Sequence, residues 1–163
     1  MNKIILIGFA TSYKTTVGRL LADKLQYSFV DTDAEIERRN NLTIQQIFDT
    51  YGEKYFRAEE SQLLTELAQS SRAVIACGGG TALADNFDQF VANGVVVWLT
   101  ATAQTVLSRL GDTQRPLFDG RTYEQIDGYI SARNPIYSKY ANLKISTDGK
   151  SSNEIAQQIL SMI

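Results

Sequence analysis

The sequence predicts an α/β fold: a doubly wound, five-stranded parallel sheet with helices on both faces, forming an α/β/α sandwich. Short apolar runs alternate along the chain with segments whose apolar residues recur at helical spacing, a pattern typical of such sheets. The runs contain few polar residues, as expected of strands that are buried on both faces. We expect strands at residues 4–7, 28–31, 73–76, 95–99 and 143–146, accompanied by about eight helices.

Length and composition limit the classes of protein that this chain can belong to. A chain of 163 residues can bury one hydrophobic core, so we expect a single domain over residues 1–163. The net charge of −2 argues against bulk nucleic-acid binding, and no apolar run is long enough to span a membrane. We therefore expect a cytoplasmic monomer. The sequence has no histidine and one cysteine, Cys77, so acid–base chemistry must come from carboxylates, lysines or a bound ion.

The segment from residue 3 to residue 16 predicts a phosphate-binding loop. An apolar run ends at Gly8, and a helical pattern starts at about Thr15. A helix N-terminus offers unpaired N–H groups and a partial positive charge to an anion. We expect Lys14 to reach the β- and γ-phosphates of a nucleotide and the Thr15 hydroxyl to bind Mg²⁺. The alternative is an ordinary strand–loop–helix unit with a surface lysine.

This loop matches the pattern G-x-x-x-x-G-K-[ST] incompletely, because Tyr13 stands where the second glycine is expected. We expect that position to have a positive φ, where a bulky residue costs about 1–3 kcal/mol. Either the loop keeps its shape and holds this strain, or it relaxes when empty. In the second case ATP must first rebuild the loop. We expect Tyr13→Gly, alone or with Thr11→Gly, to tighten ATP binding about tenfold.

Two carboxylates follow the second predicted strand, Asp31 and Asp33. Asp33 is a plausible N-cap for a helix that runs to about residue 39. Alternatively, both carboxylates lie at the carboxyl edge of the sheet, where open α/β folds bind ligands. One would then hold water on Mg²⁺ while the other accepts a hydroxyl proton. The spacing leaves both interpretations open.

Further along, helices are predicted from Thr43 to Gly52 and over residues 54–69. In the second of them Arg57 lies beside glutamates, which by itself indicates a solvated ion-pair face. The glycines at 78–80 follow the third strand and allow the backbone to lie against a ligand, although a flexible turn would use them too.

The last third of the chain contains a predicted lid. Residues 111–122 lack periodicity and contain Arg115, and an unstructured loop of about a dozen residues is usually functional or disordered. A lid that closes over phosphate would exclude water and deliver a cation. Helices are expected over residues 103–110, 123–137 and 152–163, with Pro135 kinking or ending the second.

Taken together, these landmarks resemble the shikimate kinase family of P-loop kinases, from residue 4 to the final helix. The residues that carry the resemblance are Asp31-Thr32-Asp33, Phe56-Arg57 with Glu60, Gly78-Gly79-Gly80, Arg115-Pro116-Leu117, and Arg133 with Pro135 and Tyr137. The resemblance implies ATP-dependent phosphorylation of the 3-hydroxyl of shikimate, a step of chorismate and aromatic amino acid biosynthesis.

The resemblance also implies roles for individual residues. The substrate contacts are Asp33, Arg57, Gly79, Gly80 and Arg133, with the substrate-binding region at about 32–60. The catalytic residues are Asp33, Lys14 and Arg115, and the metal ligands are Thr15 and Asp31. The nucleotide-binding residues are Gly8, Ser12, Tyr13, Lys14, Thr15, Thr16, Arg109, Arg115 and Lys150, with Arg109 stacking on adenine.

The chain departs from the family loop, Gly-x-x-Gly-x-Gly-Lys-[Ser/Thr], at Thr11 and Tyr13. These replacements are expected to lower nucleotide affinity and turnover. One alternative is therefore a shikimate-kinase-like protein with impaired nucleotide binding that acts as a binding or regulatory protein. Another is a kinase for a different small hydroxylated anion, such as gluconate, against which the arginines and the two aspartates argue.

Overall fold

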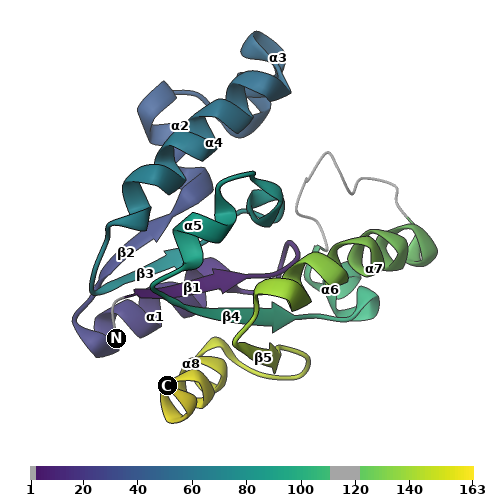
Figure 1. Cartoon of the computed structure of the whole chain (residues 1–163). Coiled ribbons are helices and arrows are strands. Elements are labelled where there is room, and N and C mark those ends of the chain that lie inside the picture. Colours follow the sequence, from purple (N-terminus) through teal and green to yellow (C-terminus); the bar gives the residue numbers. More distant parts are fainter. Residues whose placement is uncertain (1–2, 111–121) are drawn as a thin grey trace.

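The computed structural model describes residues 3–110 and 122–163, and its five strands form one parallel sheet. The strand order is β2-β3-β1-β4-β5, and all four pairings are parallel (Figure 1). The strands are β1 (Lys3–Ile7), β2 (Ser28–Asp31), β3 (Ala73–Ala76), β4 (Val95–Thr100) and β5 (Leu143–Ser146). The predicted fold class is confirmed.

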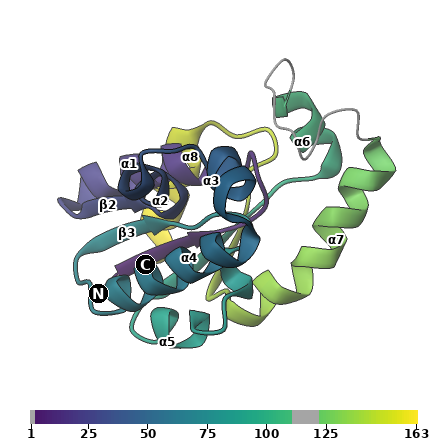
Figure 2. The same ribbon diagram turned by 90° about the horizontal axis from the view of Figure 1, so that it is seen from above.

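Eight α-helices accompany the sheet in the described part of the chain. They are α1 (Lys14–Leu25), α2 (Thr32–Asn40), α3 (Ile44–Tyr51), α4 (Glu53–Ala68), α5 (Phe87–Val91), α6 (Ala103–Leu110), α7 (Tyr123–Tyr140) and α8 (Ser152–Met162), with a 3₁₀ turn at Thr81–Leu83. Figure 1 shows α1 and α8 below the sheet and α4 and α5 above it. Figure 2 shows α4 crossing over β1 and α7 running along one side of the molecule. None of the described helices combines the length and apolarity needed to cross a bilayer.

The alternation of side chains along β1 explains why helices cover both faces. Ile4 and Leu6 belong to the core that α1 and α8 cover, whereas Ile5 and Ile7 belong to the core under α4, α5 and α7. Successive side chains of a strand point to opposite faces, so an apolar run such as β1 needs cover on both. Every residue of β1 is buried.

The topology gathers the predicted functional segments at one edge of the sheet. β1 pairs with β3 on one side and with β4 on the other, so Leu6 has partners in both Ala76 and Val97. Chain connections lead from this centre to opposite sides, which makes the carboxyl ends of these strands a topological switch point. Such points are where ligands bind in open α/β sheets.

Two details of the helices differ from expectation. Of the two effects expected of Pro135, ending the helix is wrong, because α7 continues through Tyr140, and a kink stays a prediction. Proline removes one backbone hydrogen bond, but Tyr137 in the next turn is buried and its ring lies 5.9 Å from that of Trp98. This packing holds the helix together beyond the proline. The short helix α5 was not placed from the sequence, although its Phe87 and Phe90 are fully buried.

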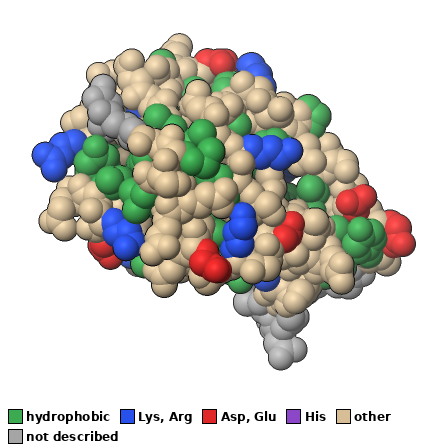
Figure 3. All heavy atoms as spheres, turned by 90° about the horizontal axis from the view of Figure 1, so that it is seen from below, with side chains coloured by type: hydrophobic (Ala, Val, Ile, Leu, Met, Phe, Trp, Pro, Cys, Tyr) green, Lys and Arg blue, Asp and Glu red, His purple; other side chains and the backbone are tan. Residues whose placement is uncertain are grey.

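The surface does not concentrate positive charge on the face drawn in Figure 3. Lys and Arg side chains lie apart there, with Asp and Glu side chains between them. A nucleic-acid-binding face would instead show clustered basic residues.

Candidate active site

The loop between β1 and α1 wraps around the Lys14 side chain. Lys14 Nζ donates hydrogen bonds to the carbonyl oxygens of Gly8, at 2.7 Å, and Phe9, at 2.8 Å. Gly8 has a φ of 147°, and a Cβ there would lie 2.3 Å from the Leu99 carbonyl oxygen, so no side chain fits. The buried hydroxyl of Ser12 donates to Phe9 O at 2.7 Å. The loop therefore forms a compact turn at the N-terminus of α1, where helix N–H groups can bind an anion.

Thr11 and Tyr13 hold the left-handed backbone conformation, each with a φ of 63°. The expected positive φ before Lys14 is confirmed. Whether the loop relaxes when it is empty stays a prediction. The left-handed conformation costs about 1–2 kcal/mol for a residue with a side chain. Arg109 opposes this cost: its Nη1 donates to Thr11 O at 2.8 Å, and its guanidinium lies 3.9 Å from the centroid of the Tyr13 ring. A cation–π contact contributes about 0.5–1 kcal/mol at exposed sites.

Asp31, and not Asp33, caps α2. Asp31 is the last residue of β2, and its Oδ1 accepts a hydrogen bond from Ala34 N at 3.1 Å. The expectation that Asp33 caps this helix is therefore wrong, because the helix begins one residue before it, at Thr32. Asp31 Oδ2 accepts the hydroxyl hydrogen of Thr15.

The Thr15 and Asp31 oxygens fit a magnesium site. Mg²⁺ prefers oxygen ligands and usually binds through one or two carboxylates together with substrate phosphates and water. No group of three or more His, Cys, Asp or Glu side chains able to hold a metal occurs in the described residues. The protein would thus supply one hydroxyl and one carboxylate, and phosphate oxygens would supply further ligands.

The Asp33 carboxylate lies against the backbone of Gly78. A Cβ added to Gly78 would lie 2.5 Å from Asp33 Oδ1, so only glycine allows this approach. The pKa of Asp33 is raised to about 6, mainly by burial. The nearby charges of Asp31 and Glu60 also raise this pKa, and each outweighs the lowering by Lys14. Asp33 and Lys14 line the same hollow, of about 620 Å³. A carboxylate with a raised pKa beside a phosphate-binding lysine is suited to accept a proton near neutral pH.

Two arginines from different helices meet the glycine segment that follows β3. Arg133 of α7 donates from Nη1 to the carbonyl oxygen of Gly79 at 2.7 Å, and the Tyr137 hydroxyl donates to the same oxygen at 2.6 Å. Arg57 of α4 lies where a Cβ on Gly80 would come within 3.1 Å of its Nη2. Positive charge from α4 and α7 therefore converges on residues 78–80.

Arg57 forms the exposed ion pair expected from its neighbours, with its Nε 3.6 Å from Oε1 of Glu53, but it also pairs with a buried carboxylate. Its Nη1 donates to Glu60 Oε1 at 2.9 Å, and Glu60 is only 1% exposed. The other Glu60 oxygen accepts the Thr81 hydroxyl at 2.8 Å. Because the buried carboxylate is paired on both oxygens, it orients the guanidinium and also fixes the end of the glycine segment.

None of the three glycines has a positive φ, so backbone conformation does not require them, and only Gly78 and Gly80 allow a close approach. A Cβ on Gly78 would meet Asp33, and a Cβ on Gly80 would meet Arg57. A Cβ on Gly79 would meet no described atom within 4 Å. Gly78 N also donates to the Thr32 hydroxyl at 3.0 Å. Hydrogen bonds at both ends argue against a flexible turn, and Gly79 faces open space between the charged side chains.

A second hollow, of about 460 Å³, adjoins the phosphate loop and is lined by Arg109 and Lys150 among others. Arg109 Nη1 donates to the hydroxyl of Thr147 at 2.9 Å and Nη2 donates to its carbonyl oxygen at 2.8 Å. Lys150 Nζ donates to Gln158 Oε1 at 3.0 Å. Sequence reasoning missed Thr147, because a lone threonine after a strand carries no signal of its own.

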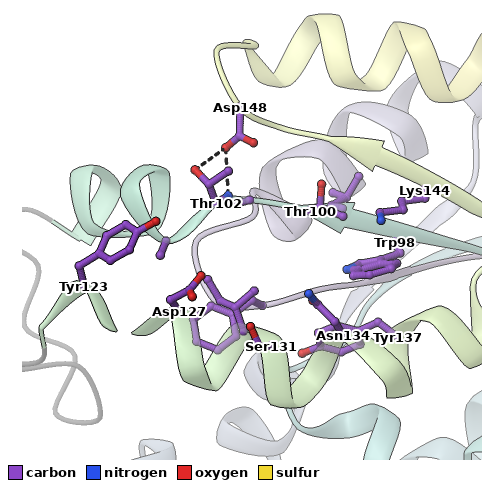
Figure 4. Close-up of a pocket in the computed structure, with 15 residues that line it drawn as sticks. Trp98, Thr100, Thr102, Tyr123, Asp127, Ser131, Asn134, Tyr137, Lys144 and Asp148 are labelled. Atoms are coloured by element: carbon purple, nitrogen blue, oxygen red, sulfur yellow. Dashed lines mark hydrogen bonds between the residues drawn. The ribbon is translucent and has the colours of Figure 1, made fainter. Parts of the chain in front are cut away.

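Another cavity, of about 300 Å³, lies between α7 and the carboxyl ends of β4 and β5 (Figure 4). None of the predicted site residues that the structure describes belongs to its lining. At its rim Asp148 Oδ1 accepts hydrogen bonds from Thr102 N, at 3.1 Å, and from the Thr102 hydroxyl, at 3.3 Å (Figure 4). This contact ties the loop after β4 to the loop after β5, which carries Thr147.

The predicted lid lies almost wholly outside the described residues. Arg115 is among residues 111–121, so its catalytic and nucleotide-binding roles stay predictions. Thr122, at the end of the predicted range, is the N-cap of α7, and its Oγ1 accepts a hydrogen bond from Gln125 N at 3.3 Å.

The fold and this site define a class of protein, the P-loop kinases that act on small substrates. A phosphate-binding loop, a hydroxyl–carboxylate pair suited to Mg²⁺, a buried carboxylate and converging arginines occupy one edge of a doubly wound sheet. Phosphoryl transfer needs this set of charges around the reacting groups.

The comparisons with known proteins identify the family. The family model for shikimate kinase matches residues 11–163. A shikimate kinase of Moorella thermoacetica is 42% identical over 160 residues, which cover 97% of this chain and 92% of the relative. One of Persephonella marina is 40% identical over 165 residues, with 100% and 99% covered. The chain belongs to the shikimate kinase family.

Solved structures agree with this assignment. The structure described as shikimate kinase from Acinetobacter baumannii in complex with shikimate superposes with a TM-score of 0.90 at 36% identity, covering 99% of this chain and 92% of that one. A gluconokinase from Sinorhizobium meliloti, at a TM-score of 0.60 and 16% identity over 98% of this chain and 90% of that one, shares the fold.

The strain at Thr11 can be tested by stability measurements. Its Oγ1 is buried and has no hydrogen-bond partner among the described residues, and its φ is positive. Thr11→Gly removes both costs and should raise the free energy of unfolding by about 1–2 kcal/mol after the entropy cost of glycine is subtracted. Thr11→Ala removes the hydroxyl and the γ-methyl group but keeps a Cβ at the positive φ, so it should raise the free energy of unfolding by less. Urea unfolding of the three proteins measures both differences, and a Thr11→Gly variant less stable than the parent would contradict the strain argument.

Proposed function

We propose that this chain transfers the γ-phosphoryl group of ATP to the 3-hydroxyl of shikimate, forming shikimate 3-phosphate and ADP in chorismate biosynthesis. The observation that carries this proposal is the position of Asp33, whose carboxylate lies between the phosphate loop and the glycine segment that Arg57 and Arg133 approach. Membership of the shikimate kinase family supports the same substrate and reaction.

Shikimate is a small anion, and the two arginines are suited to its carboxylate. Arg57 and Arg133 present planar guanidinium groups from two helices to the open side of Gly79. Guanidinium groups bind carboxylates through paired, charge-assisted hydrogen bonds. Binding the carboxylate at this end would leave the hydroxyls of the ring facing Asp33 and the phosphate loop.

Asp33 then acts as the general base. As the 3-oxygen of shikimate bonds to the γ-phosphorus, its proton passes to an Asp33 carboxylate oxygen, and the bond from phosphorus to the departing ADP oxygen breaks. With a pKa of about 6, Asp33 is ionised at neutral pH and still binds a proton readily. Lys14 offsets negative charge on the transferred group.

The remaining roles follow from the position of each residue. Thr15 and Asp31 hold Mg²⁺, which when bound neutralises charge on the phosphates. The backbone N–H groups of the loop and of the first turn of α1 bind phosphate oxygens. This group comprises Gly8, Ser12, Tyr13, Lys14, Thr15 and Thr16. Arg109 and Lys150 bind the nucleoside end of ATP. The proposal also includes Arg115 and the lid, whose residues 111–121 lie outside the described part of the chain.

We propose further that residues 1–163 form one kinase domain. The support for this is that one sheet contains strands from β1 to β5, so both halves of the chain share a core. A monomeric state and a cytoplasmic location stay predictions, as does the absence of nucleic-acid and membrane partners.

The two alternative functions have less support. Impaired nucleotide binding was inferred from Thr11 and Tyr13, yet the loop holds the left-handed conformation at both positions. The gluconokinase neighbour shares only the fold at 16% identity. No observation favours either alternative over shikimate phosphorylation.

The direct test is ATP consumption in a coupled assay with Mg²⁺. We expect turnover that requires shikimate and that gluconate does not replace, because the site offers two arginines and a carboxylate base in one hollow. Consumption of ATP that is unchanged by shikimate, or that gluconate stimulates equally, would contradict the proposal.

The base can be tested with Asp33→Asn, which keeps the side-chain shape but cannot accept a proton. We expect turnover to fall by about 10²-fold or more, while shikimate still binds. The ligand-free variant should also be more stable than the parent at pH 7 by about 1–3 kcal/mol, because the raised pKa of Asp33 means that its charge is costly in the folded state.

The pH dependence of that stability gain gives the control. The raised pKa predicts a gain that is complete above about pH 6 and disappears as the pH falls below about 4, where the side chain is protonated in both states. Steady-state kinetics and urea unfolding without metal measure the two effects. Retained turnover would mean that Asp33 positions the substrate without taking its proton.

The carboxylate contact can be tested with Arg133→Ala. Loss of this guanidinium should weaken shikimate binding by about 2–4 kcal/mol, the usual cost of removing one partner of a charge-assisted pair. Arg19→Ala, on the opposite face of the sheet in α1, is the matched control and should leave affinity unchanged. Calorimetry that gives the same shikimate affinity for Arg133→Ala and the parent would remove the carboxylate assignment.

A further inference from the structure

The Tyr13–Arg109 pair forms the boundary between the two hollows of the site. The first hollow contains the phosphate loop with Lys14 and Thr15, and the second contains Lys150. Tyr13 and Arg109 are the residues that line both of them. A ligand that occupies both hollows must therefore pass directly over this pair.

Hydrogen bonds from Arg109 hold the pair in place. Three hydrogen bonds fix the guanidinium, one to Thr11 and two to Thr147. Thr147 is fully buried, and its hydroxyl donates to Thr100 O at 2.8 Å. The next residue, Asp148, accepts a hydrogen bond from Thr102 N, as Figure 4 shows. The guanidinium is thus a fixed support for the Tyr13 ring, which remains 36% exposed.

The second hollow has the chemistry of a site for a polar, planar group. Its described lining contains an aromatic ring, two cations and the side chains of Gln104, Thr105 and Ser108, and no carboxylate is among these residues. Its volume of about 460 Å³ lies within the range of small-molecule sites. The adjoining hollow binds phosphate by the argument above. A ligand with a phosphate chain and a planar base, a nucleoside polyphosphate, matches both parts.

We propose that the side chain of Tyr13 is a nucleoside-binding residue of this enzyme, with its ring contacting the base or ribose of the nucleotide whose phosphates lie in the loop. The proposal rests on the proposed function, because it assumes that ATP occupies the loop. Tyr13 is then a determinant of selectivity for nucleoside polyphosphates over other polyphosphates.

If the Tyr13 ring contacts the nucleoside, removing the ring should weaken ATP binding, which is the opposite of the effect expected from loop strain. If the loop collapsed when empty, glycine at position 13 would strengthen ATP binding. The structure contains the formed loop with Tyr13 in place, at a φ of 63°, so the ring is compatible with the loop shape that binds phosphate. A smaller residue at position 13 removes the exposed aromatic surface next to the second hollow. Stacking of a base on an aromatic side chain contributes about 1–3 kcal/mol, equivalent to on the order of tenfold in affinity.

The experiment compares two ligands on four proteins by calorimetry with Mg²⁺ present. The ligands are ATP and inorganic tripolyphosphate, which has the phosphate chain without the nucleoside. The proteins are the parent, Tyr13→Ala, Tyr13→Phe and the control Tyr129→Ala. Tyr129 is 37% exposed, as Tyr13 is at 36%, but it lines neither hollow.

We expect Tyr13→Ala to weaken ATP binding about tenfold and to change tripolyphosphate binding by less than about twofold. Tyr13→Phe should restore most of the ATP affinity, because it keeps the ring, and Tyr129→Ala should bind both ligands like the parent. A Tyr13→Ala variant that binds ATP as tightly as the parent, or more tightly, overturns the proposal. Equal weakening of both ligands also overturns it, since the ring would then only support the loop.

The outcome also separates this proposal from the proposed function. If the parent consumes ATP with shikimate and Tyr13→Ala keeps the parental ratio of ATP to tripolyphosphate affinity, only the role of Tyr13 fails. If the parent binds neither ligand, the proposed kinase activity fails and the role of Tyr13 fails with it.

Discussion

The active site depends on the position of β1 at the centre of the parallel sheet. Because β1 pairs with β3 and β4, the segments that follow these strands and β2 emerge at one edge. The phosphate loop, the two aspartates and the glycine segment are three such segments. Parallel pairing requires every strand to end at the same edge, so the buried core that stabilises the sheet also brings the reacting groups together.

Close approach of backbone to side chains is the second constraint on the site. Gly8 lies under the Leu99 carbonyl, and Gly78 and Gly80 leave room for Asp33 and Arg57. At these positions a methyl group would displace a neighbour by several tenths of an ångström or more. Gly8 alone among them also requires a positive φ, so two different physical reasons place glycine in one site.

The site stores unfavourable free energy that other contacts offset. The charge of Asp33 is buried near three other carboxylates, and Thr11 and Tyr13 hold a left-handed conformation. Arg109 opposes the backbone strain through one hydrogen bond and one ring contact. A protein only about 5–15 kcal/mol stable can hold a few such costs when a rigid sheet supports them.

The sequence by itself determined the strands, most helices, and the residues that follow each strand, because burial and helical spacing leave a periodic record along the chain. It also indicated the positive φ at Tyr13. It did not reveal that Asp31 caps α2, since both aspartates suit a helix start and only the end of β2 separates them. The contacts that orient the site join residues far apart, such as Arg133 and Gly79, 54 positions apart, or Arg109 and Thr11, 98 apart. Tertiary structure alone decided these, because they depend on how α6 and α7 pack beside the sheet, and local periodicity carries no information about that placement.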